Sequence, residues 1–139
     1  MALDPYYRAR YDAVREFTWD DVERGNPEAV ARLSELRQPP GGYSPPPLAI
    51  SDAEIPGPHG PIAIRVYRDT RTVSTGVVVW MHGGAFKWGD LDMLEAHAVA
   101  AELSTLADVV VVSVAYRLGP TYRYPVPVDD CVAVATSIC

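Results

Sequence analysis

The chain has 139 residues, of which 48% are hydrophobic and 22% are charged, a balance typical of a globular domain and not of a disordered segment. Its net charge of −6 argues against a nucleic-acid partner, and it contains no apolar run of about 18 residues that predicts a membrane span. The first residues lack the apolar stretch of a secretory signal, and Cys131 and Cys139 lie too far apart along one predicted helix for a disulfide, so we expect a cytoplasmic protein.

The first part of the chain predicts a helical arm. Residues 4–37 show apolar positions at helical spacing, and the pairs Asp4-Pro5 and Asn26-Pro27 each place a capping side chain before a proline, which predicts two helices. Gln38–Pro47 contains five prolines and two glycines, which exclude a helix or a central strand. We therefore expect residues 1–47 to form a helical arm and a linker.

Strand patterns begin after the linker. Residues 48–55 and 62–67 predict two strands, and the Gly- and Pro-rich link between them suits a hairpin-type connection. Residues 77–81 and 109–114 are continuous, β-branched apolar runs, which predict parallel strands buried on both faces.

Helical patterns alternate with these strands. Asp92 and Glu95 predict a capping box at the start of a helix over residues 92–106, and a last helix begins at about Val126. The alternation of strand and helix predicts an α/β fold for residues 48–139.

A glycine-rich loop follows the strand at residues 77–81. His82, Gly83, Gly84 and Ala85 come next in the chain, and consecutive glycines let the backbone approach a ligand closely. Successive N–H groups in such a turn point into one concavity and suit an anion, such as the oxyanion of a tetrahedral acyl-transfer intermediate. The same residues are also compatible with a simple tight turn in which His82 is a structural hydrogen-bonding residue.

The wider sequence resembles the hormone-sensitive-lipase family of α/β-hydrolases. The resemblance covers residues 48–139 and lies in four ordered segments beside the loop: Ile64–Tyr67, Gly89–Asp92, Val112–Pro120 and the stretch from Tyr124 to Asp130. Ala85 stands where the family usually has a third glycine, and Ala115 and Thr121 replace two acidic residues. The family therefore implies a partial α/β-hydrolase mixed sheet with an N-terminal helical cap arm.

The resemblance also implies a site. Gly83, Gly84 and Ala85 would form the oxyanion hole for a small acyl-ester substrate, and the arm would belong to the cap over the acyl pocket. His82 and Arg117 are expected to be structural, and Arg117 requires a carboxylate, for which Asp129 and Asp130 are candidates. No cofactor or metal is implied, no nucleic-acid or membrane partner is expected, and the oligomeric state does not follow from the sequence.

The catalytic residues of the family have no counterpart in the sequence. The nucleophile lies in a Gly-x-Ser-x-Gly turn and is followed by an acid and a base, but no serine here has those glycines, and neither His59 nor His97 lies at the position of the base. We therefore expect an N-terminal fragment of a serine ester hydrolase that is inactive alone. Two alternatives are a non-catalytic ligand-binding relative and an arylformamidase-like amidase fragment.

Overall fold

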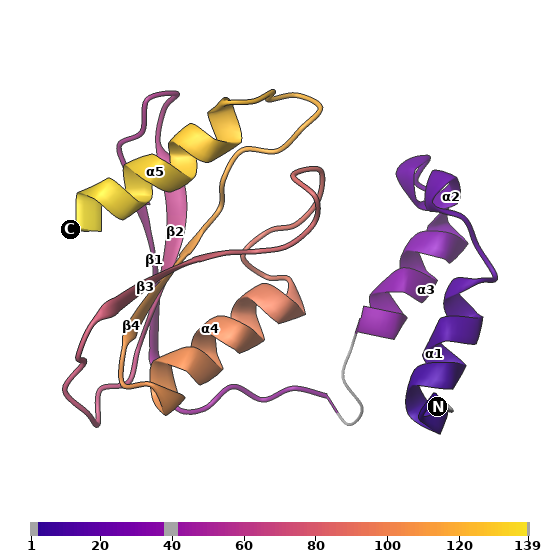
Figure 1. Cartoon of the computed structure of the whole chain (residues 1–139), viewed down its shortest axis with the longest axis horizontal. Coiled ribbons are helices and arrows are strands. Elements are labelled where there is room, and N and C mark those ends of the chain that lie inside the picture. Colours follow the sequence, from indigo (N-terminus) through magenta and orange to yellow (C-terminus); the bar gives the residue numbers. More distant parts are fainter. Residues whose placement is uncertain (1–2, 38–41, 139) are drawn as a thin grey trace. The chain divides into compact units, whose positions relative to one another are not determined.

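A computed structural model describes residues 3–37 and 42–138 of the chain. The chain divides into two compact units, Met1–Tyr43 and Ser44–Cys139, of which the first is helical and the second is α/β (Figure 1). Residues 38–41 of the predicted linker lie outside the described residues, and Cys139 lies outside them as well.

The helical unit contains α1 (Pro5–Val14), α2 (Trp19–Glu23) and α3 (Pro27–Arg37). The prediction of two helices was wrong because a separate short helix begins after Thr18. The Thr18 side chain accepts a hydrogen bond from the Asp21 backbone, and the Asp21 carboxylate accepts one from the Thr18 backbone at 3.0 Å. This reciprocal capping box stabilises a helix of only five residues.

The two predicted helix caps are confirmed. The Asp4 carboxylate accepts a hydrogen bond from the Tyr6 amide at 2.9 Å, with Pro5 in the first turn of α1. The Asn26 side chain accepts from the amides of Glu28 and Ala29 at the start of α3. Both side chains satisfy amides that have no partner inside the helix.

The helical unit buries little apolar surface of its own. Tyr7 and Tyr11, which recur at helical spacing, are exposed, and in the described part of this unit only Ala13 and Ala29 are buried. Since alanine side chains contribute little buried area, capping and local polar contacts carry much of this unit's organisation.

The α/β unit is built on a four-stranded mixed sheet. Its strands β1 (Ala49–Ile55), β2 (Ile62–Arg68), β3 (Val77–Met81) and β4 (Val110–Val114) lie in the order β1-β2-β4-β3. The β1–β2 and β2–β4 pairs are antiparallel, whereas β3 and β4 are parallel. The predicted hairpin and the predicted mixed α/β sheet are both confirmed.

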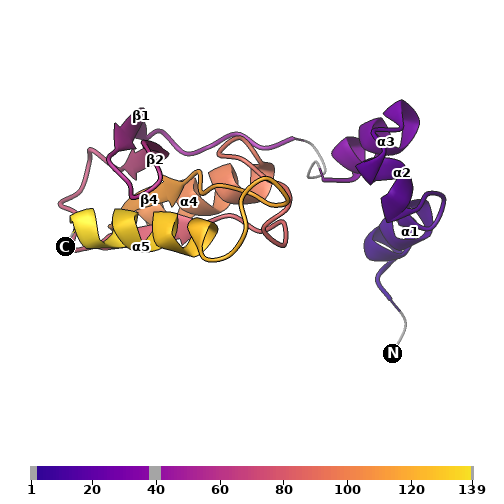
Figure 2. The ribbon, with the colours of Figure 1, turned by 90° about the horizontal axis from the view of Figure 1, so that it is seen from above.

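Helices α4 (Leu94–Leu106) and α5 (Val126–Ile138) cover opposite faces of this sheet (Figures 1 and 2). Alternate residues of β4 face the two helices: Val111 packs with Ala100 of α4, and Val112 belongs to the cluster that contains Val134 of α5. Every residue of β4 is buried, as predicted. The same prediction is wrong for β3, which is paired on one side and has both end residues about half exposed.

The predicted capping box of α4 is also wrong. Met93 occupies the N-cap position without a side-chain hydrogen bond, and Asp90 accepts from the amides of Asp92 and Met93 instead. The Asp92 carboxylate binds Arg65 at 2.7 Å, and the Glu95 carboxylate turns toward the glycine loop. Tertiary partners thus replace the local reciprocal pair.

Candidate active-site loop

The candidate site is built on the loop His82–Gly89, which follows the carboxyl end of β3. Gly84, Ala85 and Phe86 have φ values of 118°, 53° and 59°. A Cβ at Gly84 would lie 2.0 Å from the carbonyl oxygen of Trp88, so only glycine fits there. Left-handed backbone costs non-glycine residues about 1–3 kcal/mol each, and such strain clusters at functional sites.

His82 is a structural anchor of the loop. Its ring is 3% exposed, and its Nδ1 lies 2.7 Å from the carbonyl oxygen of Gly83, which can only accept, so Nδ1 carries the proton. The ring stacks on Tyr116 with centroids 4.4 Å apart, and the Tyr116 hydroxyl donates to the His82 carbonyl at 2.5 Å. Burial raises the pKa of Tyr116, which keeps its hydroxyl protonated as a donor.

The Gly83 amide has a carboxylate partner. It donates to Oε1 of Glu95, in the first turn of α4, at 2.5 Å. A Cβ at position 83 would lie 2.8 Å from the same oxygen, so the approach depends on glycine. Sequence analysis missed this contact because the spacing of Glu95 from Asp92 indicated a helix cap.

The next two amides of the loop have no partner. Among the described residues, no group accepts a hydrogen bond from the N–H of Gly84 or of Ala85. The Gly84 carbonyl accepts from the amides of Lys87 and Trp88 and so closes a tight turn. Of the three predicted oxyanion donors, Gly83 is therefore occupied by a carboxylate, and the other two are open.

An apolar cavity of about 500 Å³ adjoins the loop. Its walls come from the loop, from β3 and from α5, and include Gly83, Ala85, Phe86, Met81, Val128 and Val132. Cys131 also lines it, and burial raises the pKa of this thiol. The cavity wall is largely apolar, and Ala85 lines it; an apolar wall with a few polar groups is the usual composition of a small-molecule site.

Arg117 lies outside this cavity and ties two parts of the fold together. Its guanidinium donates to Asp130 at 2.6 Å and to the carbonyl oxygens of His59 and Pro61, and its backbone amide donates to the second Asp130 oxygen at 3.0 Å. Asp130 is fully buried. Of its two candidate carboxylates, Arg117 therefore binds Asp130. These contacts connect the β1–β2 hairpin to α5.

The other histidines take part in separate contacts. His59 Nε2 lies 2.9 Å from the Asp129 carboxylate, and His97 Nδ1 lies 3.0 Å from the Tyr67 hydroxyl. Neither side chain lines the cavity beside the loop.

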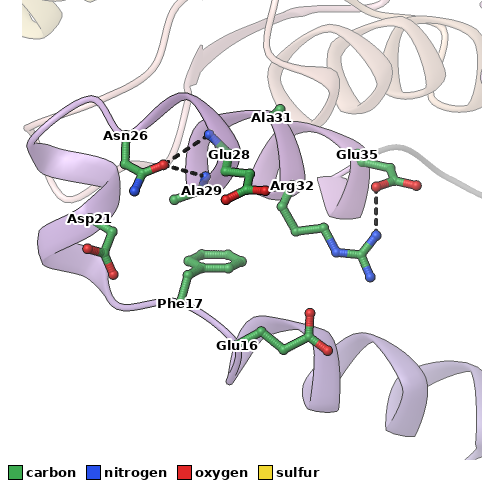
Figure 3. Close-up of a pocket in the computed structure, with 9 residues that line it drawn as sticks. All are labelled: Glu16, Phe17, Asp21, Asn26, Glu28, Ala29, Ala31, Arg32 and Glu35. Carbon is green, nitrogen blue, oxygen red and sulfur yellow. Dashed lines mark hydrogen bonds and ion pairs between the residues drawn. The ribbon is translucent and has the colours of Figure 1, made fainter.

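A second cavity, of about 620 Å³, lies within the helical unit (Figure 3). Its polar lining serves the helices: Asn26 caps α3, Asp21 caps α2, and Arg32 pairs with Glu35 at 2.7 Å. Phe17 projects into the space between these groups (Figure 3). Because Asn26, Asp21, Arg32 and Glu35 already have local partners, this cavity offers less chemistry than the loop does.

Two other kinds of feature are absent from residues 3–37 and 42–138. No helix in these ranges is long and apolar enough to cross a membrane. No group of three or more His, Cys, Asp and Glu side chains there is arranged to hold a metal ion.

Comparisons with known proteins agree with the α/β architecture of this chain. Residues 78–139 match the sequence pattern of the alpha/beta hydrolase fold. Esterase LipI of Mycobacterium tuberculosis is 36% identical over 137 residues, which cover 93% of this chain and 39% of that protein. The arylesterase of Saccharolobus solfataricus is 28% identical over 139 residues, which cover 94% of this chain and 42% of that protein. The chain has part of the α/β-hydrolase fold.

Solved structures of α/β-hydrolases confirm the architecture. An arylesterase structure superposes on this chain with a TM-score of 0.76 at 26% identity. The match covers 99% of this chain and 43% of the arylesterase chain. The esterase of Pyrobaculum calidifontis superposes with a TM-score of 0.70 at 29% identity, and this chain covers 42% of it. The chain thus spans about two fifths of the length of the relatives that it matches.

Proposed function

We propose that this chain is part of a serine carboxylic-ester hydrolase in which loop His82–Gly89 is the oxyanion hole. The observation that carries the proposal is the pair of unpartnered amides, Gly84 and Ala85, in a strained loop beside an apolar cavity. Two fixed N–H donors in a site of low polarity suit an oxygen that gains negative charge during acyl transfer, and each such donor contributes about 3 kcal/mol of barrier lowering.

The cavity supports an acyl-ester substrate. Its apolar wall, formed largely by valines of α5 and by Met81 and Phe86, suits an acyl chain, and Ala85, one of the two residues with an open amide, lines it. The relatives are named esterase and arylesterase, which favours ester over amide substrates. Gly83 has a different role in this proposal, because its amide already binds Glu95.

The 139 residues by themselves are expected to be inactive. The printed sequence has no serine between the glycines of a nucleophile turn, and an oxyanion hole without nucleophile and base supplies little catalysis. We therefore expect no hydrolysis of p-nitrophenyl butyrate above a heat-treated control. Turnover that persists through repurification would show that the chain does contain a nucleophile.

A direct test measures anion binding. Dimethylphosphinate, a tetrahedral anion, is titrated against the ¹⁵N-labelled chain, and we expect the amide signals of Gly84 and Ala85 to shift most. Gly84→Ala should abolish the shifts because of the Trp88 carbonyl, whereas Gly76→Ala, where a Cβ meets nothing within 4 Å, should not. Shifts confined to other amides would contradict an oxyanion hole, and thermal melts of both variants report on folding.

A further inference from the structure

We propose that Glu95 is a positioning residue that sets this loop as an anion site by holding the Gly83 amide. The inference rests on the proposed function, since it concerns how the same loop aims its free donors. It assigns the carboxylate a structural task within the loop and predicts that its hydrogen-bonding oxygen matters more than its charge.

The first step is the peptide group between His82 and Gly83. Its carbonyl accepts from the Tyr116 hydroxyl at 2.5 Å, and its N–H donates to Glu95 at 2.5 Å. In a planar trans peptide the carbonyl and the N–H point in opposite directions. A partner at each end therefore prevents rotation of this peptide plane.

The second step is the next peptide group, between Gly83 and Gly84. Its carbonyl accepts from Nδ1 of His82 at 2.7 Å, so its N–H, which belongs to Gly84, points away from the His82 ring. Three side chains, His82, Glu95 and Tyr116, thus fix two successive peptide planes. The first amide of the series that remains open is that of Gly84.

The third step is the need for such a restraint. Two adjacent glycines have more backbone freedom than any other pair, so an unrestrained Gly83-Gly84 segment would sample many peptide orientations. Donors stabilise an oxyanion best when they are already aimed before the reaction. A carboxylate is a strong acceptor, and Glu95 lies in the first turn of α4, where the helix dipole favours negative charge.

The test compares Glu95→Ala with Glu95→Gln. The amide oxygen of glutamine can accept the Gly83 hydrogen bond, whereas alanine cannot. We expect Glu95→Ala to weaken dimethylphosphinate binding about tenfold, the loss of one hydrogen bond to a charged group, and Glu95→Gln to restore binding to near the wild-type value. Glu54→Ala, on β1 at the opposite edge of the sheet, is the control and should have no effect.

A spectroscopic readout keeps the test independent of stability. At one fixed pH, the Gly83 amide signal should shift strongly in Glu95→Ala, which removes the acceptor, and stay close to its wild-type position in Glu95→Gln. Unchanged phosphinate affinity in a folded Glu95→Ala chain would overturn the role of Glu95, and so would a Gly83 signal that is the same with and without the Glu95 side chain. Neither result would contradict the proposed function. If the wild-type chain binds no phosphinate, the proposed function itself fails, whatever the Gly83 signal does.

Discussion

The two units of the chain use the same residue types in opposite ways. Tyr7 in the helical unit is 61% exposed, whereas Tyr67 in the α/β unit is fully buried between the sheet and α4. Arg24 and Asp20 form an ion pair at 3.4 Å with side chains 77% and 74% exposed, whereas Arg117 and Asp130 pair at 2.6 Å with side chains 15% and 0% exposed.

The contrast shows which interactions define each unit. Helix caps and i,i+4 contacts act over a few residues, and they determine where α1, α2 and α3 begin. In the α/β unit, side chains from distant parts of the sequence meet on both faces of one sheet, and Arg117 joins the β1–β2 hairpin to α5. Local polar contacts thus form helices, whereas burial and long-range pairing hold the candidate site in place.

The largest predicted effect separates the two ion pairs. Asp130→Ala would leave the Arg117 guanidinium and its backbone amide without their carboxylate, at a cost of about 3–5 kcal/mol in the free energy of unfolding. The matched variant Asp20→Ala removes an exposed pair and should cost less than about 1 kcal/mol. Urea titrations followed by circular dichroism measure both, and equal costs would show that burial does not distinguish the pairs.

Much of the fold follows from the sequence. The apolar runs at β3 and β4 predicted parallel strands, and the pattern of residues 62–67 predicted β2, whose Ile62 and Ile64 lie in one core cluster with Val134 of α5. These patterns succeed because side-chain direction in a strand depends only on position parity. The short helix α2 escaped prediction because five residues are too few to show an apolar period.

The candidate site was predicted only in outline. Consecutive glycines after the apolar run at residues 77–81 indicated where the loop lies. The contacts of Glu95 and Tyr116 with it could not be predicted, since they depend on how α4 and the segment after β4 fold back over the loop. The spacing of Glu95 from Asp92 fits a helix cap, but the Glu95 carboxylate can also contact a distant segment. Spacing alone favours the cap.

A smaller effect is expected at the cap of α2. Thr18→Ala removes the side-chain half of the capping box and should destabilise this helix by about 1 kcal/mol. Hydrogen–deuterium exchange should therefore speed up over residues 19–24 and stay unchanged in β4. Thr136→Ala, whose hydroxyl only bonds back to Val132 within α5, is the control. Faster exchange throughout both units would show that they unfold together.

The smallest effect concerns the titration of one carboxylate in each unit. Hydrogen bonds from the Arg71 side chain and backbone lower the pKa of Asp69 to about 2, and hydrogen bonds from the hydroxyl and amide of Thr18 lower the pKa of Asp21. A folded pKa below the ordinary value of 3.8 stabilises the fold above that value, and this contribution disappears as the pH falls toward about 2.

Arg71→Ala removes the guanidinium but keeps its backbone N–H, so the pKa of Asp69 should rise only part of the way to 3.8, while that of Asp21 stays unchanged. Carbon-13 titration of the carboxyl signals measures both values at once. Because the Arg71 side chain is more than half exposed, added salt should shrink the difference between wild type and variant. A pKa of Asp69 that does not respond to Arg71→Ala would mean that the backbone hydrogen bond alone lowers it.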